Sequence, residues 1–228
     1  DIQGLLNSNI NEKNSISVSG YFSKDKFDYY RENAFNYGNL AATLKWKHSY
    51  SSKLSSQISA IISNYNYQLD NKQDSANFSS MYYELNQRIL RADFLYFPFD
   101  KHKIEFGIDA TYYTLLPGVR KPLGDLSLIA PKQIEKERAL EPAFYFSDEF
   151  DVTPDFSISG GLRTTFFTSF GPSTEYKYVE NSPRSVESIV DTINFGKGRI
   201  IKVYPGTEFR ISSRLIISPR ASIKFGVQ

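Results

Sequence analysis

Apolar side chains recur at every second position along most of this chain, in segments of about ten residues. One segment places Ile104, Phe106 and Ile108 on one face and Glu105 and Asp109 on the other. A helix cannot present a period of two, and soluble strands are usually only about five or six residues long. The alternation is found in the segments 15–22, 40–47, 54–67, 83–96, 104–113, 156–166 and 222–227. The pattern predicts an all-β fold of long strands, each with one apolar and one polar face.

The connections between these segments alternate between short and long. Short links are predicted at Asn11–Asn14, Tyr50–Lys53, Phe99–Lys103, Val152–Asp155 and Ile217–Pro219. Long links are predicted at Asp25–Gly38, Gln68–Ser80, Leu115–Ala139 and Ser169–Tyr204. Short turns at one rim and long loops at the other are typical of outer-membrane barrels. We therefore predict an antiparallel transmembrane β-barrel segment of about nine to ten long strands, including a partial one at Gly4–Ile10, with short periplasmic turns and long extracellular loops.

Two segments break the alternation. Within 54–67 the apolar face slips near Asn64, and within 83–96 the apolar residues change face. An extra residue in one strand of a pair moves every later side chain to the opposite face. We therefore expect a β-bulge around Arg88–Leu90.

Composition agrees with a barrel and excludes other classes. Aromatic residues make up 15% of the chain, with Tyr 16 and Phe 18, and aromatic girdles at two membrane interfaces are one reason for such a bias. The charges nearly balance, at 27 Lys+Arg against 25 Asp+Glu, so the basic excess of a nucleic-acid binder is missing. Cysteine is absent, and no apolar run reaches the length of a membrane helix.

The polar face carries charges of both signs. They are Lys45, Lys47, Arg88, Glu105, Asp109, Arg163, Arg220 and Lys224. Charges in a water-filled lumen cost little, whereas Lys or Arg on the lipid face costs about 2–4 kcal/mol at the midplane. We expect these side chains to line a lumen, where they contact a plug or guide a substrate.

We identify no catalytic, cofactor-binding or metal-ligating set, and we predict a protein that is not an enzyme. Asp148, Glu149 and Asp151 form an acidic cluster, which we assign to a turn at the short-turn rim rather than to a paired-carboxylate or calcium site. His48 and His102 both lie beside tight turns at that same rim, and without cysteine or a third histidine they do not indicate a metal site.

Two of the predicted long loops are rich in aromatic residues. The loop 25–38 contains Phe27, Tyr29, Tyr30, Phe35 and Tyr37, and the loop 169–204 contains Phe170, Tyr176, Tyr178 and Phe195. Such rings could grip a ligand by stacking or apolar contact, or they could pack on each other and anchor at lipid headgroups. Both readings stay open, and the substrate-binding residues are not identified.

Three runs of residues resemble the barrels of TonB-dependent outer-membrane receptors. Glu141–Phe150 is similar to the family's "Y-x-x-D-E-W" strand, and Gly160–Arg163, after a short turn, is similar to its "L-x-x-G-L-R" strand. Tyr204–Arg210 resembles the family's "P-x-x-E-P-R" element. Phe150 stands in place of the family's Trp and Phe209 in place of its Pro.

The resemblance implies a specific setting. It implies a roughly 22-stranded barrel with an internal plug, in the outer membrane of a Gram-negative bacterium of the Bacteroidota type. The implied activity is import of a scarce nutrient of the siderophore, glycan or peptide class. The implied partners are outer-membrane lipid, the protein's own plug and remaining strands, the inner-membrane TonB complex and an extracellular small ligand. Residues 1–228 would be part of one barrel domain, with the plug domain and barrel closure outside this chain.

Two other interpretations of the strand pattern are a small barrel and a soluble sandwich. A small self-contained barrel of about eight to ten strands could act as an anchor or adhesin. A soluble, aromatic-rich β-sandwich could bind carbohydrate, but a face that stays apolar over about ten residues in nearly every strand argues against it.

Overall fold

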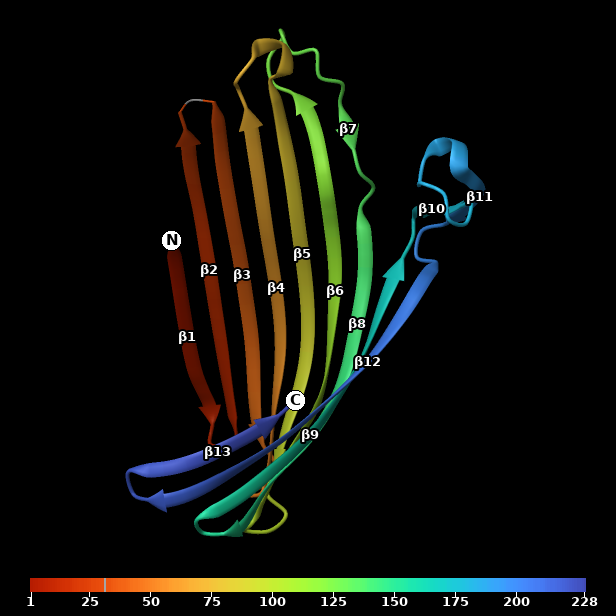
Figure 1. Ribbon diagram of the computed structural model, residues 1–228. Coiled ribbons are helices and arrows are strands. Elements are labelled where there is room, and N and C mark those ends of the chain that lie inside the picture. The colour runs from red at the N-terminus through yellow and green to blue at the C-terminus, as the bar shows by residue number, and fades with distance from the viewer. Residues whose placement is uncertain (31) are drawn as a thin grey trace.

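The chain forms one long, curved antiparallel sheet (Figure 1). A computed structural model describes residues 1–30 and 32–228. The strands are β1 (Ile2–Asn11), β2 (Asn14–Tyr29), β3 (Asn33–Ser49), β4 (Leu54–Asn71), β5 (Ser79–Tyr96), β6 (His102–Pro122), β7 (Lys132–Gln133), β8 (Glu137–Thr153), β9 (Phe156–Phe170), β10 (Ser173–Tyr178), β11 (Ile189–Phe195), β12 (Ile200–Ser218) and β13 (Ala221–Val227). Within the described residues, ten of them are joined in the order β1-β2-β3-β4-β5-β6-β8-β9-β12-β13, as predicted.

Three elements lie off this path. Strand β7 pairs with β6, and β10 and β11 form a separate two-stranded hairpin. Two short 3-10 helices, η1 (Ser75–Asn77) and η2 (Val186–Ser188), lie in connections. In the part of the chain that the structure describes, no helix has the length and apolarity to cross a membrane.

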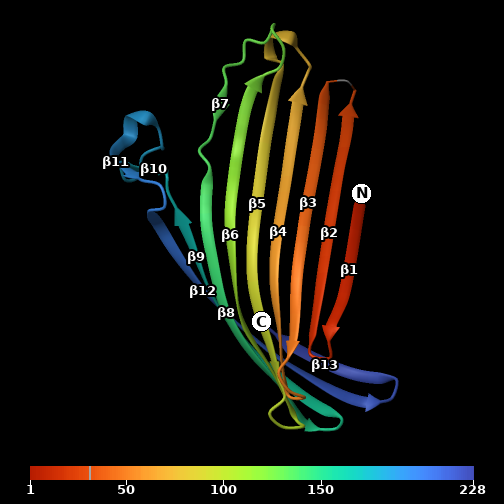
Figure 2. The ribbon, with the colours of Figure 1, turned by 180° about the vertical axis from the view of Figure 1, so that it is seen from behind.

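The connections sort by length onto two rims, which Figures 1 and 2 show from opposite sides. The lower rim has the short turns 12–13, 50–53, 97–101, 154–155 and 219–220. The upper rim has the connections 72–78, 123–136 and 171–199, together with the tight turn between β2 and β3. The predicted alternation of short and long links is confirmed except at that tight turn.

The predicted loop Asp25–Gly38 is mostly strand. Strands β2 and β3 stay in register from Lys24↔Gly38 up to Tyr29↔Asn33. Arg31, inside the predicted loop, lies outside the described residues. The loop prediction was wrong because polar and aromatic residues replaced the apolar face here, although the backbone ladder continued.

The bulge predicted around Arg88–Leu90 is also wrong. Strand β4 pairs with β5 without interruption from Leu54↔Tyr96 to Asn71↔Ser79. The irregularity in this region lies between β5 and β6, at Tyr82/Glu84. The apolar residues of β5 change face for another reason. The strand continues regularly, and the polarity of its two faces is exchanged.

Strand β4 shows this exchange of polarity most clearly. In its lower half, Ile58 and Ile62 lie on the convex face of the sheet, and in its upper half Asn64 and Asn66 follow them on that same face. On the concave face, serines give way to Tyr67 in the upper half. Apart from Ala34 and Tyr82, the convex side chains of the neighbouring upper strand halves are likewise polar: Lys24, Lys26, Asp28, Asn36, Glu84 and Asn86.

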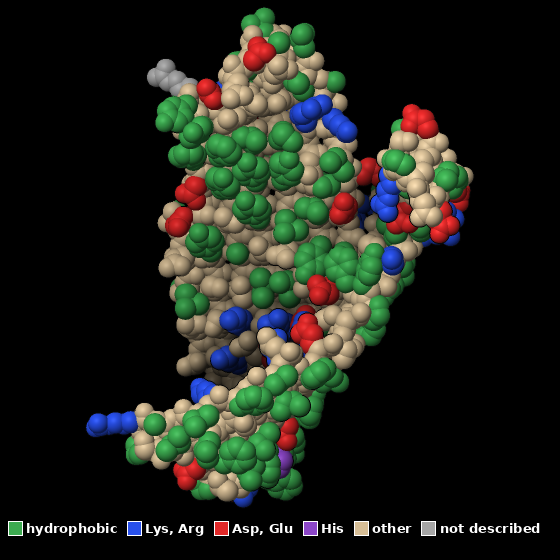
Figure 3. Space-filling view, in the orientation of Figure 1, with side chains coloured by type: hydrophobic (Ala, Val, Ile, Leu, Met, Phe, Trp, Pro, Cys, Tyr) green, Lys and Arg blue, Asp and Glu red, His purple; other side chains and the backbone are tan. Residues whose placement is uncertain are grey.

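The space-filling view shows the concave side of this arrangement. Figure 3 shows hydrophobic side chains over the upper half of the concave face and a group of charged ones over its lower half. On the convex face, Leu44 is 49% exposed and Leu90 is 66% exposed, although both are large and apolar. Among the described residues, the buried hydrophobic side chains are few: Ala34, Leu116, Ala139 and Ala143. A β-sandwich would bury its apolar faces between two stacked sheets, so that reading is wrong.

We expect Leu44→Arg to impair folding into bilayers, and Thr43→Arg to be tolerated. Leu44 lies within the convex apolar band, where an arginine costs about 2–4 kcal/mol, while Thr43 lies on the concave face. Unfolding by urea in lipid vesicles, with heat-modifiable gel mobility as the assay of folding, measures the difference. Equal tolerance of the two variants would contradict the assignment of the faces.

Candidate functional site

The lower half of the concave face brings charged residues together in two neighbouring rows that cross the strands. One row follows the register Lys45, Ser59, Arg91, Asp109 and Ala143 from β3 to β8. The other follows Lys47, Gln57, Asp93, Gly107, Tyr145, Arg163 and Glu208 from β3 to β12. The structure therefore confirms the predicted clustering of Lys45, Lys47, Asp109 and Arg163 on one polar face.

The strongest interaction between the rows is a two-point ion pair. The Nη1 and Nη2 atoms of Arg163 donate hydrogen bonds to the two carboxylate oxygens of Asp109 over 2.9 and 3.1 Å. Arg163 is on β9 and Asp109 on β6, so the guanidinium crosses β8, where the fully buried Ala143 leaves room for it. Arg91 approaches the same buried carboxylate, at 3.8 Å.

A second interaction crosses the strands above a glycine. The Tyr145 hydroxyl donates a hydrogen bond to Asp93, reaching from β8 over β6 to β5. A Cβ atom at Gly107 would collide with the Tyr145 ring, so a residue without a side chain is required there. The Arg163 guanidinium lies 5.9 Å from the centre of the Tyr145 ring and ties the two interactions into one network.

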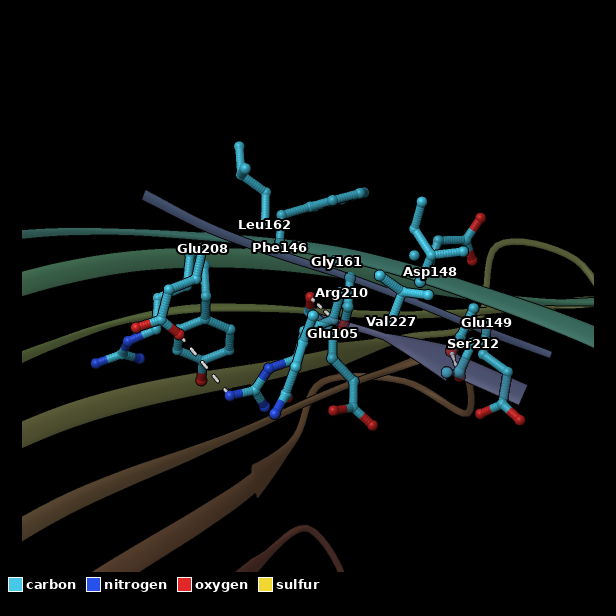
Figure 4. Close-up of a pocket in the computed structure, with 18 of the residues that line it drawn as sticks. Glu105, Phe146, Asp148, Glu149, Gly161, Leu162, Glu208, Arg210, Ser212 and Val227 are labelled. Carbon is cyan, nitrogen blue, oxygen red and sulfur yellow. Dashed lines mark hydrogen bonds and ion pairs between the residues drawn. The ribbon is translucent and has the colours of Figure 1, made fainter. Parts of the chain in front are cut away.

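Arg91, Tyr145 and Arg163 of this network also line an open cavity of about 1050 Å³. Its polar lining includes Lys103, Glu105, Glu208 and Arg210, and the Lys103 Nζ atom lies 2.7 Å from the Glu105 carboxylate. Figure 4 shows Glu105 pointing to one side of the sheet, while Phe146 and Leu162 point to the other. These four charged side chains therefore lie on the concave side.

The predicted acidic cluster is divided between the two faces. Figure 4 shows Asp148 and Glu149 pointing in opposite directions. Asp148 contacts Nδ1 of His102 at 2.8 Å on the convex face, and Glu149 lies 3.8 Å from Lys103 on the concave face. Both carboxylates have a local partner near the lower rim, as predicted, but Asp148, Glu149 and Asp151 belong to strand β8 rather than to a turn, so the turn assignment was wrong.

The two histidines lie near the lower rim, as predicted, among aromatic rings. His48 packs 4.4 Å from the Tyr50 ring and bonds the Asn14 side chain over 2.8 Å. His102 stacks on Phe150, with 4.6 Å between ring centres. Each therefore belongs to a separate aromatic group at the edge of the apolar band.

Arg88 does not line the concave face as predicted. It pairs across the sheet with Ile62 and Tyr112, so it lies on the convex face, directly above Leu90. The prediction was wrong because it placed a bulge between these two residues. Arg220, another predicted lumenal charge, lies in the turn between β12 and β13.

The upper half of the concave face is an aromatic wall. Tyr37, Tyr67 and Tyr83 lie side by side on β3, β4 and β5, with 5.2 and 5.7 Å between successive ring centres. Phe27 and Phe35 extend the group on β2 and β3, at 6.1 Å from each other. These five residues are called the aromatic wall below. Sequence reasoning missed Tyr67 and Tyr83; the signal was the period of two, which continues past the exchange of polarity.

A second cavity lies beside the aromatic wall, near the upper rim. It has a volume of about 590 Å³ and is bounded by strand residues Tyr113 and Phe167, the loop residue Ile134, and Tyr176 of the β10–β11 hairpin. The Tyr113 hydroxyl donates to the Glu141 carboxylate over 2.8 Å, and residues 135–138 add four charged side chains to the lining. Aromatic and aliphatic side chains beside oriented polar groups are a usual combination in a small-molecule site.

The β10–β11 hairpin carries its own ion pair. Lys177 Nζ lies 2.9 Å from the Asp191 carboxylate. The hydrogen bond from Lys177, followed by one from the Thr192 backbone N–H, holds the pKa of Asp191 below its ordinary value. The pair is therefore charged at neutral pH. The hairpin, which fills much of the predicted loop 169–204, was not anticipated as a strand pair.

Comparison with known proteins gives structural likeness only. No protein-family model matches the chain, and no curated protein matches its sequence. Among solved structures, the copper transporter OprC has a TM-score of 0.72 at 8% identity, over 98% of this chain and 35% of that one. BauA, the ferric preacinetobactin receptor of Acinetobacter baumannii, has a TM-score of 0.65 at 11% identity, over 98% of this chain and 39% of that one. The ferric citrate transporter FecA has a TM-score of 0.57 at 12% identity, over 98% and 38%.

These similar structures are TonB-dependent receptors, the class that the sequence resembles. At such low identities the likeness shows the fold, which is that of an antiparallel β-barrel segment. The chain spans between about a third and two fifths of the length of these three proteins.

We expect Arg163→Ala to lower the free energy of unfolding by about 2 kcal/mol, because it leaves a buried carboxylate with one distant cation. Lys45→Ala, which removes a concave-face charge that forms no ion pair among the described residues, should change it by less than about 0.5 kcal/mol. Urea titration of the folded barrel in detergent measures both. Equal effects would show that the Asp109 network does not stabilise the wall.

Proposed function

We propose that this chain is the barrel-wall portion of a TonB-dependent transporter in the outer membrane of a Gram-negative bacterium. It would form part of a single barrel domain, with a plug domain and further strands completing it. The observation that carries the proposal is the exchange of polarity along continuous strands of β2 to β5. Lower strand halves are apolar outside and charged inside, and upper halves are polar outside and aromatic inside.

Each half of the strands suits a different environment. A lower half with an apolar convex face fits a lipid bilayer around a water-filled lumen. An upper half with a polar convex face fits a region above the bilayer, where strands continue as a rigid funnel. Long connections and the β10–β11 hairpin lie at the upper rim, which supports an extracellular orientation for that rim.

The interior offers separate surfaces for a ligand and for a plug. The aromatic wall and the cavity of about 590 Å³ beside it would contact an incoming small ligand. The lower charged rows, with the Asp109–Arg163 pair, would face the protein's own plug domain. Energy would reach the plug from the inner-membrane TonB complex. This arrangement requires no catalysis by the wall.

The nutrient belongs to the siderophore, glycan or peptide class in this proposal, and the sequence motifs favour a receptor of the Bacteroidota type. Similar structures are named as a copper transporter, a ferric preacinetobactin receptor and a ferric citrate transporter, which supports transport over the anchor or adhesin reading. Aromatic rings can contact an apolar ligand or stack on a sugar ring, so the aromatic wall suits several of these ligands.

Cysteine labelling of intact cells tests the topology, since the chain itself contains no cysteine. Full-length protein freed of any other cysteine would carry Tyr67→Cys, Asn66→Cys or Leu44→Cys and be exposed to a membrane-impermeant maleimide. We expect the first two to react, because both lie above the apolar band, and Leu44→Cys to stay unreactive in lipid. Labelling at positions 66 and 67 only after the outer membrane is permeabilised would invert the orientation and overturn the proposal.

Growth tests address transport itself. Cells carrying Tyr67→Ala with Tyr83→Ala would be compared with cells carrying Asn66→Ala, a neighbour on the opposite face. With siderophore-bound iron, a glycan or a peptide as the limiting nutrient, we expect one nutrient to support poorer growth of the tyrosine variant. The same nutrient should fail in cells without TonB. Loss of two aromatic contacts should weaken uptake about tenfold at limiting concentration. Unchanged uptake of every nutrient would exclude the aromatic wall as a ligand surface.

A further inference from the structure

The convex face has a groove that the proposed transport path does not use. The groove has a volume of about 460 Å³ and is lined by residues from β2 to β8. Ala42, Ala60 and Ala110 line it, and Ala60 lies in one cross-strand row between Leu44 and Leu90. Methyl side chains between branched ones leave a trough in an otherwise continuous apolar surface.

One cation lies at the upper end of this groove. Arg88 is exposed, with the apolar Leu90 next below it on the same face and the polar Asn86 next above. Tyr112 is its cross-strand neighbour. Among the ion pairs and hydrogen bonds between described residues, none involves the Arg88 side chain. An arginine is costly at the bilayer midplane but not at the interface, where an anion can neutralise it.

Above Arg88 the convex face carries an ordered amide network. Asn64 donates hydrogen bonds to Asn86 and to Glu84, both over 2.8 Å, and Asn66 donates to Asn64 over 3.1 Å. Glu84, the acidic group nearest along the strand, is therefore held by an amide rather than by Arg88. The amide and carboxylate groups of this network are partly exposed, and such groups are hydrogen-bonding partners for sugar hydroxyls.

From bottom to top, the convex face thus presents an apolar groove, an unpaired guanidinium and an amide network. We propose that this face binds one phosphorylated glycolipid of the outer leaflet. An acyl chain would lie in the groove, a phosphate would accept hydrogen bonds from Arg88, and the sugar would face the amide network. A guanidinium can hold a phosphate through two parallel hydrogen bonds, which a lysine cannot do. The inference rests on the proposed placement of the apolar band in lipid.

Native mass spectrometry of the delipidated full-length protein in detergent tests this site. The probes are lipid A with its phosphates, lipid A without phosphates, and phosphatidylglycerol. The variants are Arg88→Gln, Ala60→Leu, which fills the groove, and Lys45→Gln, a matched removal of one charge on the concave face. Heat-modifiable gel mobility confirms that each variant is folded.

We expect Arg88→Gln to weaken binding of phosphorylated lipid A by about tenfold and to leave the dephosphorylated lipid unchanged. Ala60→Leu should weaken both forms, and Lys45→Gln neither. Phosphatidylglycerol, which lacks the sugar, should bind the native protein more weakly than phosphorylated lipid A. Equal binding of phosphorylated lipid A by Arg88→Gln and native protein would overturn the proposal, as would equal affinity for the two forms of lipid A. Such a result, with cysteine labelling and nutrient uptake as expected, would leave the transport proposal standing.

Discussion

Pairing of backbone hydrogen-bonding groups is the constraint on which the rest of this structure depends. A strand in lipid has no water to satisfy its N–H and C=O groups, so each must pair with a neighbouring strand. The ladder from β1 to β13 meets this requirement without using side chains, except along the outer edges of β1 and β13, which have no partner strand among the described residues. Strands from β2 to β12 in the main sheet contain 15 to 21 residues, whereas a tilted strand crosses the bilayer in about 9–11. The excess length carries the same ladder into water.

Because backbone hydrogen bonds hold the strands together, the side chains at each height of the sheet can match the polarity of their surroundings. The lower half of β4 places Ile58 toward the convex side, and the upper half places Asn66 there, with no break in register. Charges inside the lower half are mostly neutralised within the wall, as the Asp109–Arg163 pair shows. The inner surface is thus divided into a charged lower zone and an aromatic upper zone on one continuous sheet.

The alternation of apolar residues predicted the long strands, the antiparallel order and the short turns well, because a period of two is a local property. It also predicted the lumenal placement of Lys45 and Asp109. The prediction failed at Arg88 and in the segment 25–38. In both places the polarity of the strand faces changes, and this was interpreted as a bulge or a loop although the strands continue. The partnership of Asp109 with Arg163 was beyond sequence reasoning, since these residues are 54 positions apart and on strands that are not adjacent. The same holds for the dependence of Tyr145 on Gly107, which follows from sheet register.

The position of the aromatic wall on strands, rather than on loops, affects the entropy of recognition. Rings such as Tyr37 and Tyr67 are held by a paired backbone and by each other, so most of their conformational freedom is already lost when the sheet folds. A molecule that meets them would lose mainly its own freedom, since no loop has to become ordered around it. Such a surface would favour fast, shape-selective binding. Any slower step in which a segment becomes ordered would take place in the connections of the upper rim.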